Sequence, residues 1–202
     1  MRTVYFDLET GGLEPGRFPV IQFAAVVVNE NWEELEALEM KIQFRPADCD
    51  PGALAVNGYT EEAWANAERE TVAMDRIDAL MRKYADVQKI SAKGKPWSVA
   101  RVAAHNAKFD CDHIVAWFKK HGRFLVAGVY EPLDTLALAR WYSSNHPNPP
   151  KDHKLATLCE WLGVPLLQAH DAMADIRATV GVAKVLCSRM GIGDGHRLLE
   201  AS

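Results

Sequence analysis

Two acidic residues, Asp7 and Glu9, stand one residue apart in the apolar segment VYFDLETGGL at positions 4–13. In a strand, residues i and i+2 point to the same face and lie roughly 6.6 Å apart along the backbone. The two carboxylates would repel each other there, and no basic residue stands next to them in the sequence. Divalent cations that prefer oxygen ligands, Mg²⁺ or Mn²⁺ rather than Zn²⁺, would balance this charge. The alternative is that the strand ends early and both acids lie in a solvated turn.

A third acid, Asp110, ends the segment AHNAKFD, which follows the apolar run 99–104. Open α/β sheets gather their ligands at the ends of such strands, so Asp110 is a candidate to join the first two acids. Taken alone, Asp110 is better explained as the N-cap of a helix that begins at Cys111.

The segment AHDAMADIRATVGVAKVL supplies His170 and Asp175. If Asp171 is the N-cap of the last helix, His170 is residue N′ and Asp175 is residue N4, and side chains at these two positions meet. A contact between an imidazole and a carboxylate is unusual there but suits a site of acid–base chemistry. The alternative is a surface histidine and an ordinary first-turn acid that the helix dipole favours.

Hydropathy patterns indicate which elements position these residues. Residues rich in β-branched and aromatic types predict strands at 3–8, 19–28, 38–44, 99–104 and 125–130. Helical spacing appears within 60–85 and predicts further helices at 111–120, 134–143, 154–162 and 172–190, whereas 88–98 has the composition of an exposed loop. The order predicts an α/β fold in which helices flank a mixed five-stranded sheet, with an antiparallel hairpin group continued by parallel strands.

Length and composition limit the remaining classes. At 202 residues and 49% hydrophobic, the chain is expected to form a single domain over residues 1–202. The formal charge of −4 argues against binding nucleic acid mainly through a basic surface. The four cysteines lack the spacing of a zinc site or of a disulfide framework, so they are expected to be reduced thiols. Neither a leader nor a membrane span is recognisable, so a cytoplasmic protein without a membrane partner is expected.

The three acidic segments together resemble the DEDDh, or DnaQ-like, family of 3′–5′ exonucleases, which has an RNase H-like fold. The first motif is DLETGGL at 7–13, the second is HNAKFD at 105–110, and the third is His170 followed by Asp175. The resemblance spans roughly residues 3–187, and the combination of three motifs is far more specific than any one of them.

The resemblance implies a role for each matched residue. Asp7, Glu9 and Asp175 would bind one of two Mg²⁺ or Mn²⁺ ions, Asp7 would bridge to the second, and Asp110 would support the ions directly or through water. His170 would be the general base. The segment Thr10, Gly11 and Gly12 would cradle the 3′-terminal nucleotide. Leu13 would wedge beside the last bases or, alternatively, pack on the core, and Asn106 would orient the substrate or satisfy the loop backbone.

The expected function is metal-dependent removal of nucleotides from the 3′ end of a nucleic acid, with single strands and DNA favoured. The enzyme would be proofreading-like or free-standing, with a polymerase or another replication or repair protein as a possible partner. One alternative is an RNA-trimming exoribonuclease of the same family. The other is a non-catalytic nucleic-acid-binding module on this fold, which would be expected to lose metal ligands because clustered carboxylates cost stability.

Overall fold

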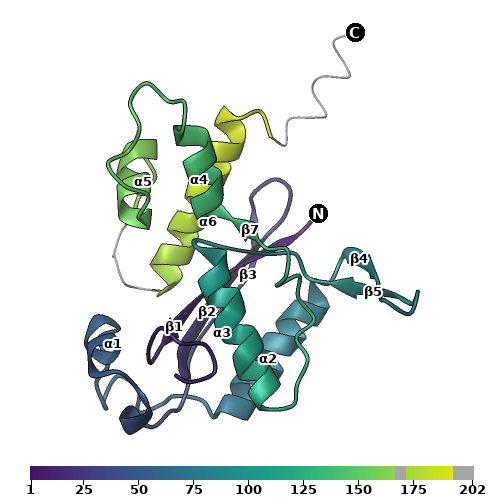
Figure 1. Cartoon of the computed structure of the whole chain (residues 1–202), viewed down its shortest axis with the longest axis vertical. Coiled ribbons are helices and arrows are strands. Elements are labelled where there is room, and N and C mark those ends of the chain that lie inside the picture. Colours follow the sequence, from purple (N-terminus) through teal and green to yellow (C-terminus); the bar gives the residue numbers. More distant parts are fainter. Residues whose placement is uncertain (167–171, 193–202) are drawn as a thin grey trace.

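The structure is a computed structural model that describes residues 1–166 and 172–192 (Figure 1). Its centre is a mixed five-stranded sheet with the strand order β3-β2-β1-β6-β7. Strands β1 to β3 pair antiparallel, whereas β6 and β7 continue the sheet parallel to β1. The strands are β1 (Thr3–Thr10), β2 (Val20–Val28), β3 (Glu34–Lys41), β6 (Val102–Ala104) and β7 (Leu133–Asp134). This arrangement confirms the predicted fold class.

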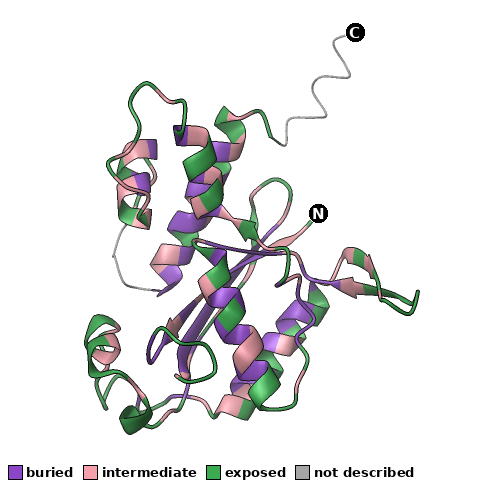
Figure 2. Cartoon of the chain, in the orientation of Figure 1, coloured by how far each residue is buried: buried purple, intermediate pink, exposed green. Residues whose placement is uncertain are grey.

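Helices cover both faces of the sheet. One face carries α2 (Glu70–Lys83) and α3 (Ala107–Lys120), and the other carries α6 (Ala172–Arg189). Two further helices, α4 (Thr135–Ser143) and α5 (Leu155–Leu162), pack against α6. The buried residues follow the sheet and the helix faces turned toward it (Figure 2).

Alternation along β1 decides which side chains meet which helix. Phe6 belongs to the core cluster that includes Ile77 of α2 and Ile114 of α3. Tyr5 points the other way and packs in the cluster that includes Ile176 of α6. Since successive strand residues face opposite sides, the odd-numbered positions of β1, including 7 and 9, face α6.

Several elements differ from the sequence-based prediction. The segment 88–98 is not a loop throughout, because β4 (Val87–Ile90) and β5 (Pro96–Val99) form a separate two-stranded sheet. The predicted strand at 125–130 is wrong: that largely buried segment makes one isolated bridge, between Ala127 and Ala100. A short 3₁₀ helix, η1 (Pro46–Asp48), and helix α1 (Pro51–Val56) were not predicted.

The helix predicted from Cys111 begins four residues earlier, at Ala107. All four cysteines are free, as their spacing predicted. Among the helices of the described residues, none is both long and apolar enough to span a bilayer.

Candidate active site

Strand β1 carries the first two acids into the sheet. Asp7 pairs with Ala24 and Glu9 with Gln22 on β2, and β1 continues through Thr10. The strand therefore does not end before these residues, and the solvated-turn alternative is wrong. A register shift between Glu9 and Thr10 marks the point where the chain leaves regular pairing with β2.

Asp110 reaches the same end of β1 from helix α3. Its Oδ1 accepts a hydrogen bond of 3.0 Å from the backbone N–H of Leu8, the residue between the two strand acids. Asp110 is only 2% exposed and lies within the first turn of α3, not at its N-cap. The N-cap alternative is therefore wrong, and the helix and the strand are joined where Asp7 and Glu9 lie.

Asp175 lies in the first turn of α6, on the face of the sheet toward which Asp7 and Glu9 point. Its negative charge raises the pKa of both strand acids, so the three carboxylates lie within electrostatic reach of one another. His170 and Asp171 lie outside the described residues, so the predicted contact between His170 and Asp175 remains a prediction.

The electrostatics of the four acids favour a positively charged ligand. Burial, followed by the charges of Glu9 and Asp175, raises the pKa of Asp7 to about 7. Burial and the charge of Asp175 raise the pKa of Glu9 to about 7. Burial, and next the charge of Asp7, raises the pKa of Asp110 well above its usual range. A cation would stabilise the ionised form of every member of this group.

The donor set fits a hard divalent cation, because it consists entirely of carboxylate oxygens. Within residues 1–166 and 172–192, no three His, Cys, Asp or Glu side chains already form a group that could hold a metal ion. The fit therefore rests on the burial and mutual repulsion of these acids rather than on completed coordination.

The segment after Glu9 forms one wall of a cavity of about 610 Å³. The hydroxyl of Thr10 donates a 2.8 Å hydrogen bond to the carbonyl of Gly12 and so closes a tight turn. A Cβ on Gly12 would lie 2.5 Å from the ring of Phe18, so this position has no room for a side chain. Leu13 also lines the cavity and is 82% exposed, so the alternative that it packs on the core is wrong.

Helix α1, which sequence reasoning missed, forms the opposite wall of this cavity with Ala53 and Val56. Two hydrogen bonds fix it to the glycine segment: the N–H of Asp50 donates to the carbonyl of Gly11 at 2.7 Å, and Nδ2 of Asn57 donates to the carbonyl of Thr10 at 2.9 Å. The signal for this helix was present in the sequence, because Asp50 is an N-cap residue followed by a proline at the first helical position.

The loop between β6 and α3 is held by its backbone and by His105. Asn106 has a left-handed conformation with φ 69°, makes no side-chain cap bond to α3, and donates its N–H to Oδ1 of Asp134 at 3.1 Å. The imidazole of His105 bonds the hydroxyl of Thr135 at 2.9 Å and the carbonyl of His153 at 3.0 Å. His105 therefore has a structural role that its place in the second motif did not reveal.

The mixed sheet, whose central strand carries half-buried acids near its end and is faced by further acids on two helices, matches the expected RNase H-like fold. The exonuclease family model RNase_T matches residues 97–183, the part that contains the second motif and Asp175. Together with the first motif on β1, this match agrees with the resemblance of the three motifs to the DEDDh, DnaQ-like exonucleases.

Relatives with curated names agree with this family. The chain is 30% identical over 179 residues to the PolC-type DNA polymerase III of Bacillus cereus, covering 87% of this chain and 11% of that protein. It is 26% identical over 208 residues to exodeoxyribonuclease I of Escherichia coli, covering 92% of this chain and 40% of that protein. The chain therefore corresponds to a minor part of each of these relatives.

Solved structures show the same fold. The zinc-bound complex of Escherichia coli ExoI with single-stranded DNA superimposes with a TM-score of 0.75 at 23% identity, covering 96% of this chain and 42% of that one.

Proposed function

We propose that this chain is a metal-dependent 3′–5′ exonuclease that releases nucleotides from single-stranded DNA. The observation that carries the proposal is the convergence of Asp7, Glu9, Asp110 and Asp175 at one end of β1, where each of the first three has a raised pKa. A non-catalytic module would gain nothing from this repulsion, whereas a phosphodiesterase needs such a site for cations beside the scissile phosphate.

Asp7, Glu9 and Asp175 would hold one Mg²⁺ or Mn²⁺ ion, Asp7 would also contact a second, and Asp110 would support the pair. When bound, such ions supply charge stabilisation on phosphate oxygens and a more acidic water. The backbone of Thr10, Gly11 and Gly12 would then carry the 3′-terminal sugar and base against the wall that α1 provides. Leu13, exposed at the rim of that cavity, would contact the neighbouring base.

His170 would accept a proton from the attacking water. An imidazole with an ordinary pKa of about 6.5 is mostly neutral at pH 7 and can act as a general base. In the sequence, His170 stands two residues before the first residue of α6, the helix that carries Asp175 in its first turn.

The preference for single-stranded DNA is supported by the relatives. The curated relatives are a DNA polymerase and an exodeoxyribonuclease, and Escherichia coli ExoI has been solved with a dT13 oligonucleotide. A DNA polymerase is a proposed partner because the similar segment of the PolC-type proteins belongs to a polymerase chain.

The proposal is tested by digesting 5′-labelled single- and double-stranded DNA and RNA with Mg²⁺, with Mn²⁺ and with EDTA. We expect single-stranded DNA to be shortened from its 3′ end, with loss of activity in EDTA. Faster digestion of RNA would replace the DNA preference with exoribonuclease activity, and digestion of no substrate would contradict the proposed function.

Two carboxylate variants and a matched control locate the activity in the proposed site. Asp7→Asn and Asp175→Asn should each abolish release of mononucleotides. Asp112→Asn should not, because Asp112 lies on the exposed side of α3 and pairs with Lys108 at 2.5 Å. His170→Ala should depress the rate while leaving Mn²⁺ binding, measured by calorimetry, largely intact. Equal residual activity in Asp7→Asn and the control would overturn the assignment.

A further inference from the structure

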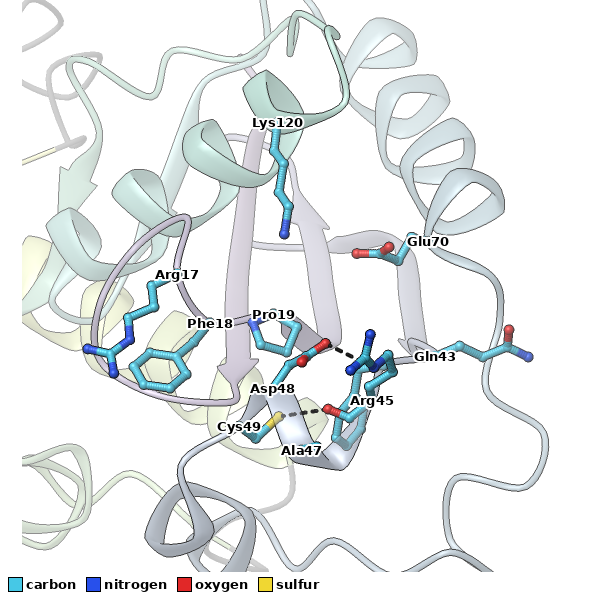
Figure 3. Close-up of a pocket in the computed structure, with 11 residues that line it drawn as sticks. Arg17, Phe18, Pro19, Gln43, Arg45, Ala47, Asp48, Cys49, Glu70 and Lys120 are labelled. Carbon is cyan, nitrogen blue, oxygen red and sulfur yellow. Dashed lines mark hydrogen bonds and ion pairs between the residues drawn. The ribbon is translucent and has the colours of Figure 1, made fainter.

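We infer that the pocket drawn in Figure 3 is a second nucleotide-binding subsite, which takes a nucleotide of the single strand on the 5′ side of the cleaved bond. This inference rests on the proposed function. The pocket has a volume of about 810 Å³, which is enough for a nucleotide, and it lies between the β1–β2 loop, the segment after β3 and the end of α3. Its lining includes Arg17, Phe18, Gln43, Arg45, Asp48 and Lys120.

The second pocket adjoins the cavity beside Glu9. Arg17 and Phe18 line both of them, and they form the wall that the two spaces share. The ring of Phe18 lies against Gly12, where a Cβ would be 2.5 Å from the ring. A strand whose 3′ nucleotide occupies the first cavity can therefore pass over this wall and enter the second pocket without crossing the core.

Helix α3 connects the two sites along one face. Asp110 stands at its first turn, and one turn later Nε2 of His113 donates a 3.3 Å hydrogen bond to the carbonyl of Leu13. One turn further, the β1–β2 loop approaches α3 closely, since a Cβ on Gly16 would lie 3.5 Å from Ala116. Lys120 follows on the next turn, and its amino group extends into the second pocket (Figure 3). Asp110 and Lys120 are thus about 15 Å apart along the helix, a distance that a few nucleotides can span.

The charges of the pocket leave one cation available for a phosphate. Arg17 pairs with Glu14 at 2.7 Å, and Arg45 pairs with Asp48 at 3.5 Å. Glu70 accepts a 3.0 Å hydrogen bond from the indole of Trp117. Lys120, by contrast, has no ion-pair partner within residues 1–166 and 172–192. The chain has a formal charge of −4, so its overall charge does not attract a phosphate. A phosphate outside the metal site would instead be bound by this local cation.

The other lining groups suit a nucleobase. Phe18 offers an apolar ring with the guanidinium of Arg17 4.9 Å from its centre, a surface on which a base can stack. Asp48 has an exposed carboxylate at the edge of the pocket, which can accept a hydrogen bond from the polar edge of a base.

The test compares a substrate that occupies only the catalytic site with one that also extends into the second pocket. The p-nitrophenyl ester of thymidine 5′-monophosphate occupies the catalytic site alone, whereas a labelled oligothymidylate also reaches the second pocket. For Lys120→Glu, we expect the KM of the oligothymidylate to rise roughly 5- to 10-fold more than that of the ester. Lys119→Glu is the matched control, because Lys119 is an exposed neighbour on α3 that does not line the pocket.

A second readout does not need turnover. Binding of labelled oligothymidylate in EDTA, measured by fluorescence anisotropy, should be weaker for Lys120→Glu than for Lys119→Glu, and the difference should shrink as salt is added. Equal KM values and equal binding for the two variants would overturn the subsite. If the wild type hydrolyses neither substrate, the proposed function fails, and the anisotropy comparison alone decides whether the pocket binds a strand.

Discussion

The backbone N–H of Leu8 donates a 3.0 Å hydrogen bond to the carboxylate of Asp110, and so joins the central strand to the first turn of α3. Leu8 stands between Asp7 and Glu9, so this bond fixes the part of β1 that presents both acids. Asp110 therefore has two functions that can be separated. It accepts a hydrogen bond from a buried backbone group, and it adds a negative charge to the site.

Replacing Asp110 should separate these functions in the free energy of unfolding. Asp110→Ala leaves the buried N–H of Leu8 without an acceptor, and we expect it to lower the free energy of unfolding by about 1–3 kcal/mol. Asp110→Asn retains an acceptor oxygen and removes a charge that the site disfavours, so its loss should be below about 1 kcal/mol. Urea denaturation in EDTA measures both, and equal losses would show that the hydrogen bond contributes little.

Without divalent cations, stability should fall as the pH rises from about 4 to about 7. The pKa values of Asp7 and Glu9 in the folded chain are about 7, above their ordinary values near 4, so the folded state holds more protons than the unfolded state across this window. The decrease should be on the order of 1–4 kcal/mol and should level off above pH 7.

Denaturation at a series of pH values, in EDTA and in Mg²⁺, tests this dependence. Saturating Mg²⁺ should remove most of the decrease, because the cation stabilises the ionised carboxylates of the folded state. Asp7→Asn in EDTA should show a shallower decrease than the wild type. A stability that rises with pH in EDTA would contradict the assigned electrostatics.

The main sheet could be predicted because its strands are long and regular in pattern. β2 is buried at every position, and β1 combines β-branched and aromatic residues up to the first acid. The four described acids of the site could be predicted because they stand in three motifs with recognisable order. Their convergence, however, depends on tertiary contacts such as the bond from Leu8 to Asp110, which no local pattern reveals.

Two wrong predictions concern strands, and each has a physical cause. The run 125–130 is apolar and buried up to Val129, as a strand would be, yet it lies as irregular chain beside Ala100 with one bridge, at Ala127. An apolar composition indicates that a segment is buried, but it does not determine whether the segment pairs with a neighbouring strand. The hairpin β4–β5 was missed because its residues are mostly exposed or half-buried, and within the described residues its two strands pair only with each other.

Gly11 is expected to be intolerant of a side chain for a packing reason. It does not have a positive φ, so alanine is compatible with its backbone, but a Cβ there would lie 2.5 Å from Sγ of Cys49 and 3.0 Å from Pro19. Gly11→Ala should lower the free energy of unfolding by about 1–3 kcal/mol. Adding Cys49→Ala should restore part of this loss, since it removes the closest atom and leaves the contact with Pro19.

A double-mutant cycle on Gly11 and Cys49, measured by chemical denaturation, tests this account. A favourable coupling energy between the two substitutions supports the steric explanation. Strictly additive losses would mean that the alanine at position 11 is disfavoured for another reason.

Leu13 should matter for the substrate and not for the fold. Its side chain is 82% exposed at the rim of the cavity beside Glu9, so Leu13→Ala should change the free energy of unfolding by less than about 0.5 kcal/mol. If the side chain contacts the terminal bases, its loss should raise the KM for single-stranded DNA roughly 5-fold, which corresponds to partial burial of one aliphatic side chain. Ile90→Ala is the control, because Ile90 is 77% exposed on β4, outside this cavity, and should leave KM unchanged. A Leu13→Ala variant that unfolds easily but retains the wild-type KM would instead assign Leu13 to the stability of the turn.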